Sequence, residues 1–295
     1  MCDPAEGICI IPNTEETSSA VTAQNTEKKI KIIYFSDPLC SACWGVEPIL
    51  RKLKLEYADS FEIEYNMGGL LPGWELMDGR VTPEKIAENS AKMSELYQMP
   101  MNADVWIKDP PSSSYPPSIA FKAAQIQDKN KAAVFLRKLR EDLYVKGINI
   151  AKWENIQQAA LLCSLDVNKL RSDYKHEAEK IFQDDLLMAQ KMGVRGFPCF
   201  IFTNSNDLKE TLYGIRPYDE FEAVLNRLDS RIVKQKYSGN HQSLFTVFNS
   251  MTTWEFAVMS GLSFLQAQEI LNDLEEKKEI ISLNTETGIL WTRDE

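Results

Sequence analysis

The feature that most constrains this sequence is a pair of cysteines, Cys40 and Cys43, which directly follows a short apolar run. Residues 30–35 are apolar and β-branched, which predicts a buried strand that Asp37 and Pro38 bring to an end. From Cys40 onward, apolar residues recur at steps of three and four, which predicts a helix. A C-x-x-C between a strand and a helix is typical of redox-active elements, and the alternatives are a zinc half-site or two inert cysteines.

The predicted helix gives the two cysteines different roles. Cys40 would sit at the helix N-terminus, where unpaired N–H groups and the helix dipole favour an anion and lower the pKa of a thiol. We therefore expect Cys40 to be the attacking thiolate and Cys43, one turn further on, to resolve a mixed disulfide. Ser41 and Ala42 carry no charge that would lower the pKa further, so only moderate activation is expected.

Metal and cofactor sites are not expected. A structural zinc site normally needs four ligands, whereas this chain has two histidines, His176 and His241, and one C-x-x-C. Cys2 and Cys9 are weak candidates for a metal pair or for a dithiol that exchanges with Cys40, and the alternative is two exposed thiols. Cys163 lies among leucines and is expected to be a buried structural thiol.

Charge and composition exclude several classes of partner. The formal net charge is −10, which argues against nucleic acid or an anionic membrane as the main partner. The sequence has no run of 18 apolar residues, so no membrane span is expected. The first thirty residues lack the apolar stretch of a secretory signal, which predicts a cytoplasmic protein whose six cysteines are mostly free thiols.

The rest of the chain divides into segments of different character. Residues 1–28 are polar and without periodicity, which predicts a flexible N-terminal tail. Residues 83–192 are almost wholly helical in pattern, with a proline-rich loop before a helix that is expected from Ser118. Residues 194–202 predict a strand with a proline near its start.

The C-terminal segment, residues 239–295, forms a distinct unit. Two helices with capping sequences precede a hairpin, an order that resembles a small winged-helix arrangement. Residues 252–295 hold nine acidic and three basic residues, a net charge of −6, which opposes binding to phosphate groups. Protein binding or packing is therefore the expected role of this unit.

Together, the C-x-x-C and the downstream Phe197-Pro198 resemble the DsbA-like branch of the thioredoxin superfamily. The resemblance implies an α/β, thioredoxin-like domain over residues 29–238, with a helical insertion at about 67–192. It also implies that Pro198 is cis and faces the cysteine pair, and that Phe197, Pro198 and Trp44 bind substrate. Cys199 directly after the proline departs from the family pattern and is either an auxiliary thiol or a packed one.

Within this branch, several stretches resemble the SpxH adaptor group, whose members help the ClpXP protease degrade the regulator Spx. They are residues 37–48, 115–127, 135–139 and the acidic unit that ends at 288–291. The N-terminus departs from that group in having fewer cysteines and no histidine. Residues 68–70 are more similar to disulfide isomerases of the DsbA family.

Two functions follow from these observations. The first is a cytoplasmic thiol–disulfide oxidoreductase that acts on protein substrates through Cys40 and Cys43. The alternative is an SpxH-like adaptor that binds a regulator such as Spx and presents it to ClpXP. A glutathione-dependent activity of the same fold is disfavoured, since relatives of that kind carry Ser in place of Cys40.

Overall fold

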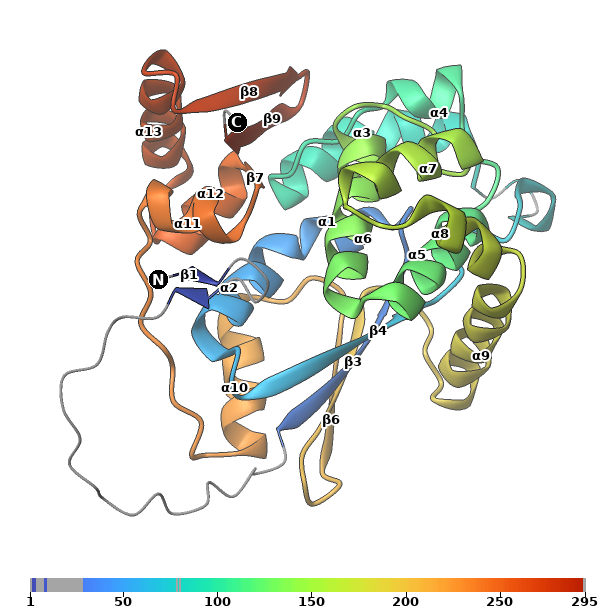
Figure 1. Ribbon diagram of the computed structural model, residues 1–295, viewed down its shortest axis with the longest axis horizontal. Helices are drawn as coiled ribbons and strands as arrows, with labels where there is room; N and C mark the ends of the chain where they lie inside the picture. Colours follow the sequence, from blue (N-terminus) through green and yellow to red (C-terminus); the bar gives the residue numbers. More distant parts are fainter. Residues whose placement is uncertain (1, 4–7, 10–28, 78, 80, 294–295) are drawn as a thin grey trace.

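The computed structural model describes residues 2–3, 8–9, 29–77, 79 and 81–293. Its centre is a four-stranded mixed sheet with the order β4-β3-β5-β6 (Figure 1). The strands are β3 (Ile30–Ser36), β4 (Phe61–Met67), β5 (Cys199–Thr203) and β6 (Lys209–Tyr213). β3 runs parallel to β4 and antiparallel to β5. This pairing places two segments that are far apart in the sequence side by side.

The two faces of this sheet pack against different helices, because successive residues of a strand point to opposite sides. One face presents Tyr34, Phe200 and Phe202 to a core shared with α2 and α10. The other face presents Phe35 and Cys199 to residues of α9. The helices on these faces are α2 (Glu47–Tyr57), α9 (Glu177–Lys191) and α10 (Tyr218–Leu228), and the short α1 (Ser41–Gly45) lies between β3 and α2 in the chain.

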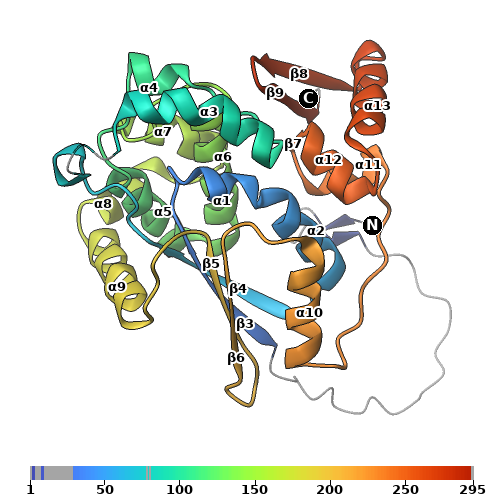
Figure 2. The ribbon, with the colours of Figure 1, turned by 180° about the vertical axis from the view of Figure 1, so that it is seen from behind.

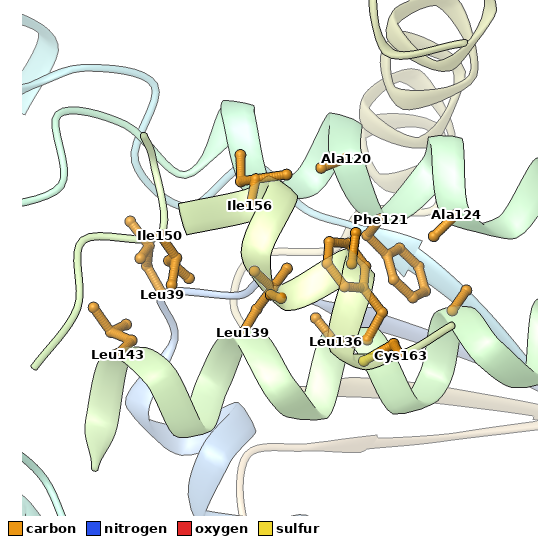
Figure 3. Packing of buried hydrophobic residues seen from close by; sticks show 14 of the residues in the cluster. Leu39, Ala120, Phe121, Ala124, Leu136, Leu139, Leu143, Ile150, Ile156 and Cys163 are labelled. Carbon is orange, nitrogen blue, oxygen red and sulfur yellow. The ribbon is translucent and has the colours of Figure 1, made fainter. Parts of the chain in front are cut away.

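The predicted helical insertion lies between β4 and β5 (Figure 2). Figure 3 shows Leu39, from the segment before the cysteine pair, among Leu139, Leu143 and Ile150 of the insertion. The cysteine segment therefore packs against the insertion as well as the sheet. Besides α9, the insertion contains η1 (Trp74–Met77), α3 (Pro83–Tyr97), α4 (Asp104–Lys108), α5 (Tyr115–Gln127), α6 (Lys129–Tyr144), α7 (Trp153–Leu162) and α8 (Val167–Tyr174).

Three predicted boundaries differ from the structure, each at a proline. The helix expected after Cys40 is broken at Val46, because α2 starts anew with a proline in its first turn. The helix expected from Ser118 begins earlier, as α5, since its prolines occupy first-turn positions that need no N–H donor. The strand expected over 194–202 begins only at Cys199, after a proline that cannot donate to the ladder.

The C-terminal unit has its own hydrophobic core, which includes Leu271 and Trp291. Both predicted helix starts carry complete capping boxes, one at Thr252 and one at Ser263. The predicted hairpin is present, in a sheet of order β7-β9-β8, whereas α11 and β7 were not predicted. The winged-helix assignment stays a prediction. The elements are α11 (His241–Val247), β7 (Ser250–Thr252), α12 (Thr253–Ser260), α13 (Phe264–Glu276), β8 (Ile280–Thr285) and β9 (Gly288–Arg293).

Near the N-terminus, β1 (Cys2–Asp3) pairs antiparallel with β2 (Ile8–Cys9), and Cys2 lies opposite Cys9 in the backbone register. The rest of the predicted tail, residues 1–28, lies outside the described residues, as do the side chains of these two cysteines. Within the described part of the chain, no three His, Cys, Asp or Glu side chains gather in a way that could hold a metal ion. No helix of that same part is long and apolar enough to cross a membrane.

Candidate functional site

Cys40 and Cys43, called the dithiol below, lie where the sequence predicts them, at the start of the helix after β3. Cys40 is the N-cap of α1, and its Sγ accepts a hydrogen bond from the Cys43 backbone N–H at 3.3 Å. Both are free thiols, and both are buried: Cys40 is 5% exposed and Cys43 0%. Cys40 is thus the member of the pair that a substrate can reach first.

The downstream proline segment meets the dithiol, as the family resemblance implies. The Phe197–Pro198 peptide bond is cis. The Phe197 carbonyl accepts from Cys40 Sγ across 3.6 Å, although the two residues are 157 positions apart in the sequence. The Phe197 ring packs on Gly68, where a Cβ would lie only 1.9 Å from a ring atom. Gly68 therefore allows the close approach that sets Phe197 beside Cys40.

The proton affinities of the two thiols differ from the prediction. The hydrogen bond to Cys43 and burial raise the pKa of Cys40 well above its ordinary value. Burial opposes ionisation of Cys43, but hydrogen bonds from Cys40 and Ser36 and the charge of Arg140 lower the pKa of Cys43. Both shifts arise in part from the hydrogen bond that the two thiols share, which favours the neutral form of Cys40 and the charged form of Cys43.

A buried carboxyl group organises the loop before Cys40. Asp37 is 0% exposed and accepts backbone N–H bonds from Leu39 at 2.8 Å and from Leu70 at 2.7 Å. Burial raises the pKa of Asp37 to about 6, against the lowering effect of these bonds. The sequence predicted Asp37 only as a strand stop. Its place directly after a buried strand, before the cysteines, is the signal that could have marked it.

Arg140 of α6 is a site residue that the sequence analysis missed. It is 0% exposed and donates to Ser36 Oγ at 2.5 Å, and its other terminal nitrogen lies 2.5 Å from Glu47. Its position gave a usable signal, because Leu136, Leu139 and Leu143 make it part of the apolar face of α6. A charged residue at such a position is buried and needs a partner.

A cavity of about 500 Å³ opens beside Cys40. Phe197 lines it on one side, and residues of the insertion such as Met93 and Trp106 line it on the other. Tyr144, which also lines it, donates its hydroxyl to the Leu39 carbonyl at 2.7 Å. An extended peptide with apolar side chains matches this largely apolar lining next to an accessible sulfur.

Trp44, which the resemblance implies binds substrate, is packed inside the protein. It is 0% exposed, and its indole N–H donates to the Pro100 carbonyl at 2.9 Å. Its ring stacks on Tyr144 and lies 4.3 Å from the Arg137 guanidinium. Trp44 is therefore part of the core that fixes α1, because no face of its ring is open to a ligand.

Two further cysteines whose side chains the structure describes, Cys163 and Cys199, are packed thiols. Cys199 is 0% exposed, faces α9 from β5, and has its pKa raised by burial. Cys163 is 9% exposed in the core of the insertion, where burial raises its pKa to about 11. The packed alternative thus fits Cys199, and the expectation for Cys163 is confirmed.

A second buried polar cluster, called the junction below, joins the C-terminal unit to the rest of the molecule. Glu255 of α12 is 0% exposed and accepts from both terminal nitrogens of Arg137, at 2.6 and 2.9 Å. Arg51 of α2 lies 3.2 Å from the same carboxylate and donates to the Ser250 carbonyl at 2.6 Å. Arg137 also donates to Glu141 at 2.7 Å. These four charged residues hold the C-terminal unit against α2 and α6.

Comparison with known proteins agrees with this architecture. A thioredoxin family model matches residues 34–223. The protein named ClpXP adapter protein SpxH from Halalkalibacterium halodurans is 30% identical over 297 residues, covering 98% of this chain and 96% of that protein. The SpxH protein of Shouchella clausii is 29% identical and covers 98% of this chain and 95% of its own length.

Solved structures share the fold of about two thirds of this chain. The cytosolic disulfide reductase DsbM from Pseudomonas aeruginosa matches with a TM-score of 0.55 and 21% identity, covering 67% of this chain and 97% of that chain. The similarity to SpxH proteins therefore extends over nearly the whole chain, while this structural match covers two thirds of it.

Proposed function

The chain belongs to the thioredoxin family, and from this membership we propose that it is a thiol–disulfide oxidoreductase that acts on protein substrates through Cys40 and Cys43. The observation that carries the proposal is the Cys40 Sγ facing the carbonyl of the cis Phe197–Pro198 bond at 3.6 Å, at the mouth of an apolar cavity. The proposed compartment is the cytoplasm, and the reaction needs no cofactor beyond a thiol reductant.

The proposed reaction is two thiol–disulfide exchanges. Cys40 loses its proton and attacks a substrate disulfide as a thiolate, which forms a mixed disulfide and releases one substrate thiolate, and this thiolate takes up the proton that Cys40 lost. Cys43 then loses its own proton and attacks the Cys40 sulfur, which forms the Cys40–Cys43 disulfide and releases the second substrate sulfur, and this sulfur takes up the proton of Cys43. The substrate gains two electrons and the dithiol loses them. A second dithiol or two molecules of a monothiol reductant then reduce the pair again.

The residues around Cys40 support substrate positioning. Phe197 and Pro198 offer backbone next to the sulfur, and the cavity beside it offers apolar side chains. Among the predicted substrate-binding residues we retain Phe197 and Pro198 and omit Trp44, which is buried. Cys199 takes no part in the proposed exchange, because it packs on the α9 side of the sheet.

A trapping experiment tests this proposal. The bait is the Cys43→Ser variant, in which a mixed disulfide at Cys40 cannot be resolved, and the control is the Cys40→Ser, Cys43→Ser double variant. We expect proteins from a cytoplasmic extract to be captured by the first variant alone and released by a reductant. Equal capture by both variants, insensitive to reductant, would overturn the proposal.

The second candidate function is an adaptor that presents a client, such as an Spx-type regulator, to the ClpXP protease. It is favoured by similarity to proteins named ClpXP adapter protein SpxH over 98% of this chain. At 98% coverage that length includes nearly all of residues 239–295, which we propose as a separate domain for partner binding. A partner there would be a protein, since the net charge of −6 over residues 252–295 opposes nucleic acid.

Reconstituted proteolysis tests the adaptor. Purified ClpXP and an Spx-type client are combined with and without this protein, and the half-life of the client is measured. Accelerated loss of the client by the Cys40→Ser, Cys43→Ser double variant would establish a role independent of the dithiol. An unchanged half-life with the wild-type protein would remove the adaptor hypothesis.

A further inference from the structure

The turn between β8 and β9 of the C-terminal unit contacts the loop between α3 and α4, residues 99–102, called the α3–α4 loop below. In that turn, the Thr287 hydroxyl accepts from the Met101 N–H at 2.8 Å and donates to the Met101 carbonyl at 3.2 Å. We propose that Thr287 is a positioning residue that, through Met101, sets how tightly the cavity beside Cys40 binds an apolar side chain of a substrate. The inference deepens the proposed function and rests on it, since this cavity is where a substrate of the dithiol would bind.

Met101 is part of the wall of the cavity. It is buried, and it lines the cavity together with Cys40 and Phe197, the two residues that flank the proposed substrate position. Because a methionine side chain is flexible, its place in the wall depends on where its backbone is held. A shift of the Met101 backbone would therefore change the shape of the cavity and leave the reacting sulfur atoms in place.

The α3–α4 loop also contacts two other residues of the dithiol site. The Pro100 carbonyl accepts from the indole N–H of Trp44, the residue after Cys43. The Asn102 N–H donates to the carbonyl of Tyr144, which lines the same cavity, at 2.6 Å. The loop therefore lies between the C-terminal unit and the dithiol site, and a displacement at the β8–β9 turn would move the wall of the cavity.

The β8–β9 turn is held in place by its own hydrogen bonds and by α3. Thr285 Oγ1 donates to the Gly288 carbonyl at 2.8 Å and accepts from the Thr287 N–H at 3.3 Å. Ser94 of α3 donates to the Met99 carbonyl at 2.6 Å and lies 3.2 Å from the Thr287 carbonyl. The hydroxyl of Thr287 is thus presented to the α3–α4 loop from an ordered turn.

An apolar side chain at position 287 cannot replace this hydroxyl. The backbone N–H and carbonyl of a buried residue cost free energy when they have no partner. Valine has nearly the shape of threonine but forms neither hydrogen bond, so the two groups of Met101 would have to find water or another partner. We expect the α3–α4 loop to shift as a result, and Met101 to shift with it. Serine keeps the hydroxyl and can form both bonds.

The test compares Thr287→Val with Thr287→Ser and with a matched control, Thr253→Val. The Thr253 hydroxyl also forms one accepted and one donated bond, from the Trp291 indole at 3.0 Å and to Gln268 at 3.1 Å. Both of these partners lie inside the C-terminal unit, so the control makes the same chemical change there instead of at Met101. Near-ultraviolet circular dichroism checks that each variant is folded.

The probes are two disulfide peptides that differ only in the residue beside the cysteine, which is leucine in one and serine in the other. Exchange with the reduced protein is measured against peptide concentration, which gives a half-saturating concentration and a limiting rate. Binding is measured separately, by fluorescence anisotropy, with each variant placed in a Cys40→Ser, Cys43→Ser background that cannot react. A dissociation constant is thereby obtained without any thiol chemistry.

We expect Thr287→Val to raise the dissociation constant and the half-saturating concentration of the leucine peptide about tenfold, the low end of what one methylene is worth in an apolar pocket. The limiting rate should not change, and the serine peptide should be affected much less, because it lacks the side chain that contacts the Met101 wall. Thr287→Ser and Thr253→Val should bind both peptides as the wild type does. Equal effects of Thr287→Val and Thr253→Val, or equal effects on the two peptides, would overturn the inference.

Two further variants test the route through Met101. In a Met101→Ala background, Thr287→Val should have little additional effect, because the side chain through which it acts is gone. Fully additive effects would contradict the proposed route. Ser94→Ala removes the bond from α3 to the Thr287 carbonyl and should weaken binding of the leucine peptide in the same direction. If Thr287→Val does not fold, an unchanged dissociation constant in Ser94→Ala would overturn the inference.

Failure of the proposed function gives a different result. If Thr287→Val weakens binding of the leucine peptide but the wild type exchanges with neither peptide and Cys43→Ser captures no protein, the oxidoreductase function falls and the role of Thr287 stands. If exchange and capture succeed and Thr287→Val leaves the dissociation constant unchanged, the function stands and the role of Thr287 falls. A wild-type protein that binds neither peptide would overturn the role of Thr287 whatever the outcome of the capture.

Discussion

Arg137 and Arg140 lie three residues apart on α6, yet they serve two regions whose charges are balanced in different ways. At the junction, Arg137 meets two carboxylates, Glu255 and Glu141, with well-formed hydrogen bonds. At the dithiol, Arg140 pairs with Glu47, and its Nε has no hydrogen-bond partner among the residues that the structure describes. A saturated cluster fixes one arrangement, whereas an incompletely balanced cation can respond to a charge that appears and disappears during a reaction.

The two arginines of α6 therefore serve different regions: Arg137 stabilises the packing of the C-terminal unit, and Arg140 lies beside the reactive cysteines. The junction orders the C-terminal unit against the domain that carries the dithiol. Arg137 also covers the ring of Trp44, which lies directly after Cys43. Trp44 thus connects the junction to the dithiol. Substitutions in one region can show whether the stability or reactivity of the other region changes.

The largest expected effect is at the junction. Glu255→Gln leaves Arg137 and Arg51 without their shared carboxylate in a buried site, and breaking a buried pair in this way costs about 3–5 kcal/mol. Urea unfolding followed by tryptophan fluorescence should show this loss. The matched control, Glu269→Gln on the exposed side of α13, should stay within about 0.5 kcal/mol. Equal stability of the two variants would mean that the junction does not hold the units together.

The next effect is a difference in pH dependence between the two regions. The pKa of Asp37 is raised to about 6 in the folded protein, so its stabilising contribution is complete below about pH 4 and is lost as the pH rises through about 6. Relative to Asp37→Asn, the wild-type free energy of unfolding should fall by about 2 kcal/mol between pH 4 and pH 7.

Glu141 at the junction should behave in the opposite sense. Burial opposes its ionisation, but Arg137 and Ser250 lower its pKa, so its contribution is present above its ordinary pKa and lost as the pH falls. Urea unfolding of wild type, Asp37→Asn and Glu141→Gln at several pH values measures both trends. Parallel pH profiles for the two variants would remove this distinction between the regions.

A smaller effect concerns the shape of the dithiol site. Gly68→Ala places a methyl group into the Phe197 ring, and overpacking of this kind costs about 1–3 kcal/mol. Because the Phe197 carbonyl faces Cys40, the rate of exchange with a disulfide peptide should also fall. Gly196→Ala is the control, since among the described residues no atom beyond its two chain neighbours lies within 4 Å of its Cβ position. A Gly68→Ala protein with wild-type kinetics would show that the site tolerates displacement of Phe197.

The sequence allowed the fold to be predicted because local patterns agreed with it. The strand before Cys40, the capped helices of the C-terminal unit and the cis Pro198 all depend on residues within one element or on a family motif. Boundaries failed where a proline starts an element instead of ending one, as in α2 and α5. A proline lacks a backbone N–H, but the first residues of a helix need none, so a proline can stand there and the helix then starts one or two residues away from the predicted position.

The electrostatics of the site could not be predicted in the same way. Arg140 and Ser36 are 104 residues apart, and Glu255 is 118 residues from Arg137. These pairs exist only once the insertion has packed on the sheet. The expected thiolate on Cys40 rested on the helix N-terminus alone, and that argument contained neither the hydrogen bond to Cys43 nor the burial that raise the pKa of Cys40 in the folded protein.

The smallest expected effect is at Cys199, the thiol that departs from the family pattern. Its side chain is in contact with the core that contains Phe35 and Ile201, on the face of the sheet that α9 covers. Cys199→Val fills a similar volume, so the free energy of unfolding should change by less than about 1.5 kcal/mol and the exchange kinetics should be unchanged. Cys163→Val, in the core of the insertion, is the control for replacing a packed thiol. Slower exchange in Cys199→Val alone would mean that Cys199 joins the dithiol chemistry after a rearrangement of β5. In that case a residue on the α9 face of the sheet would take part in the reaction as well.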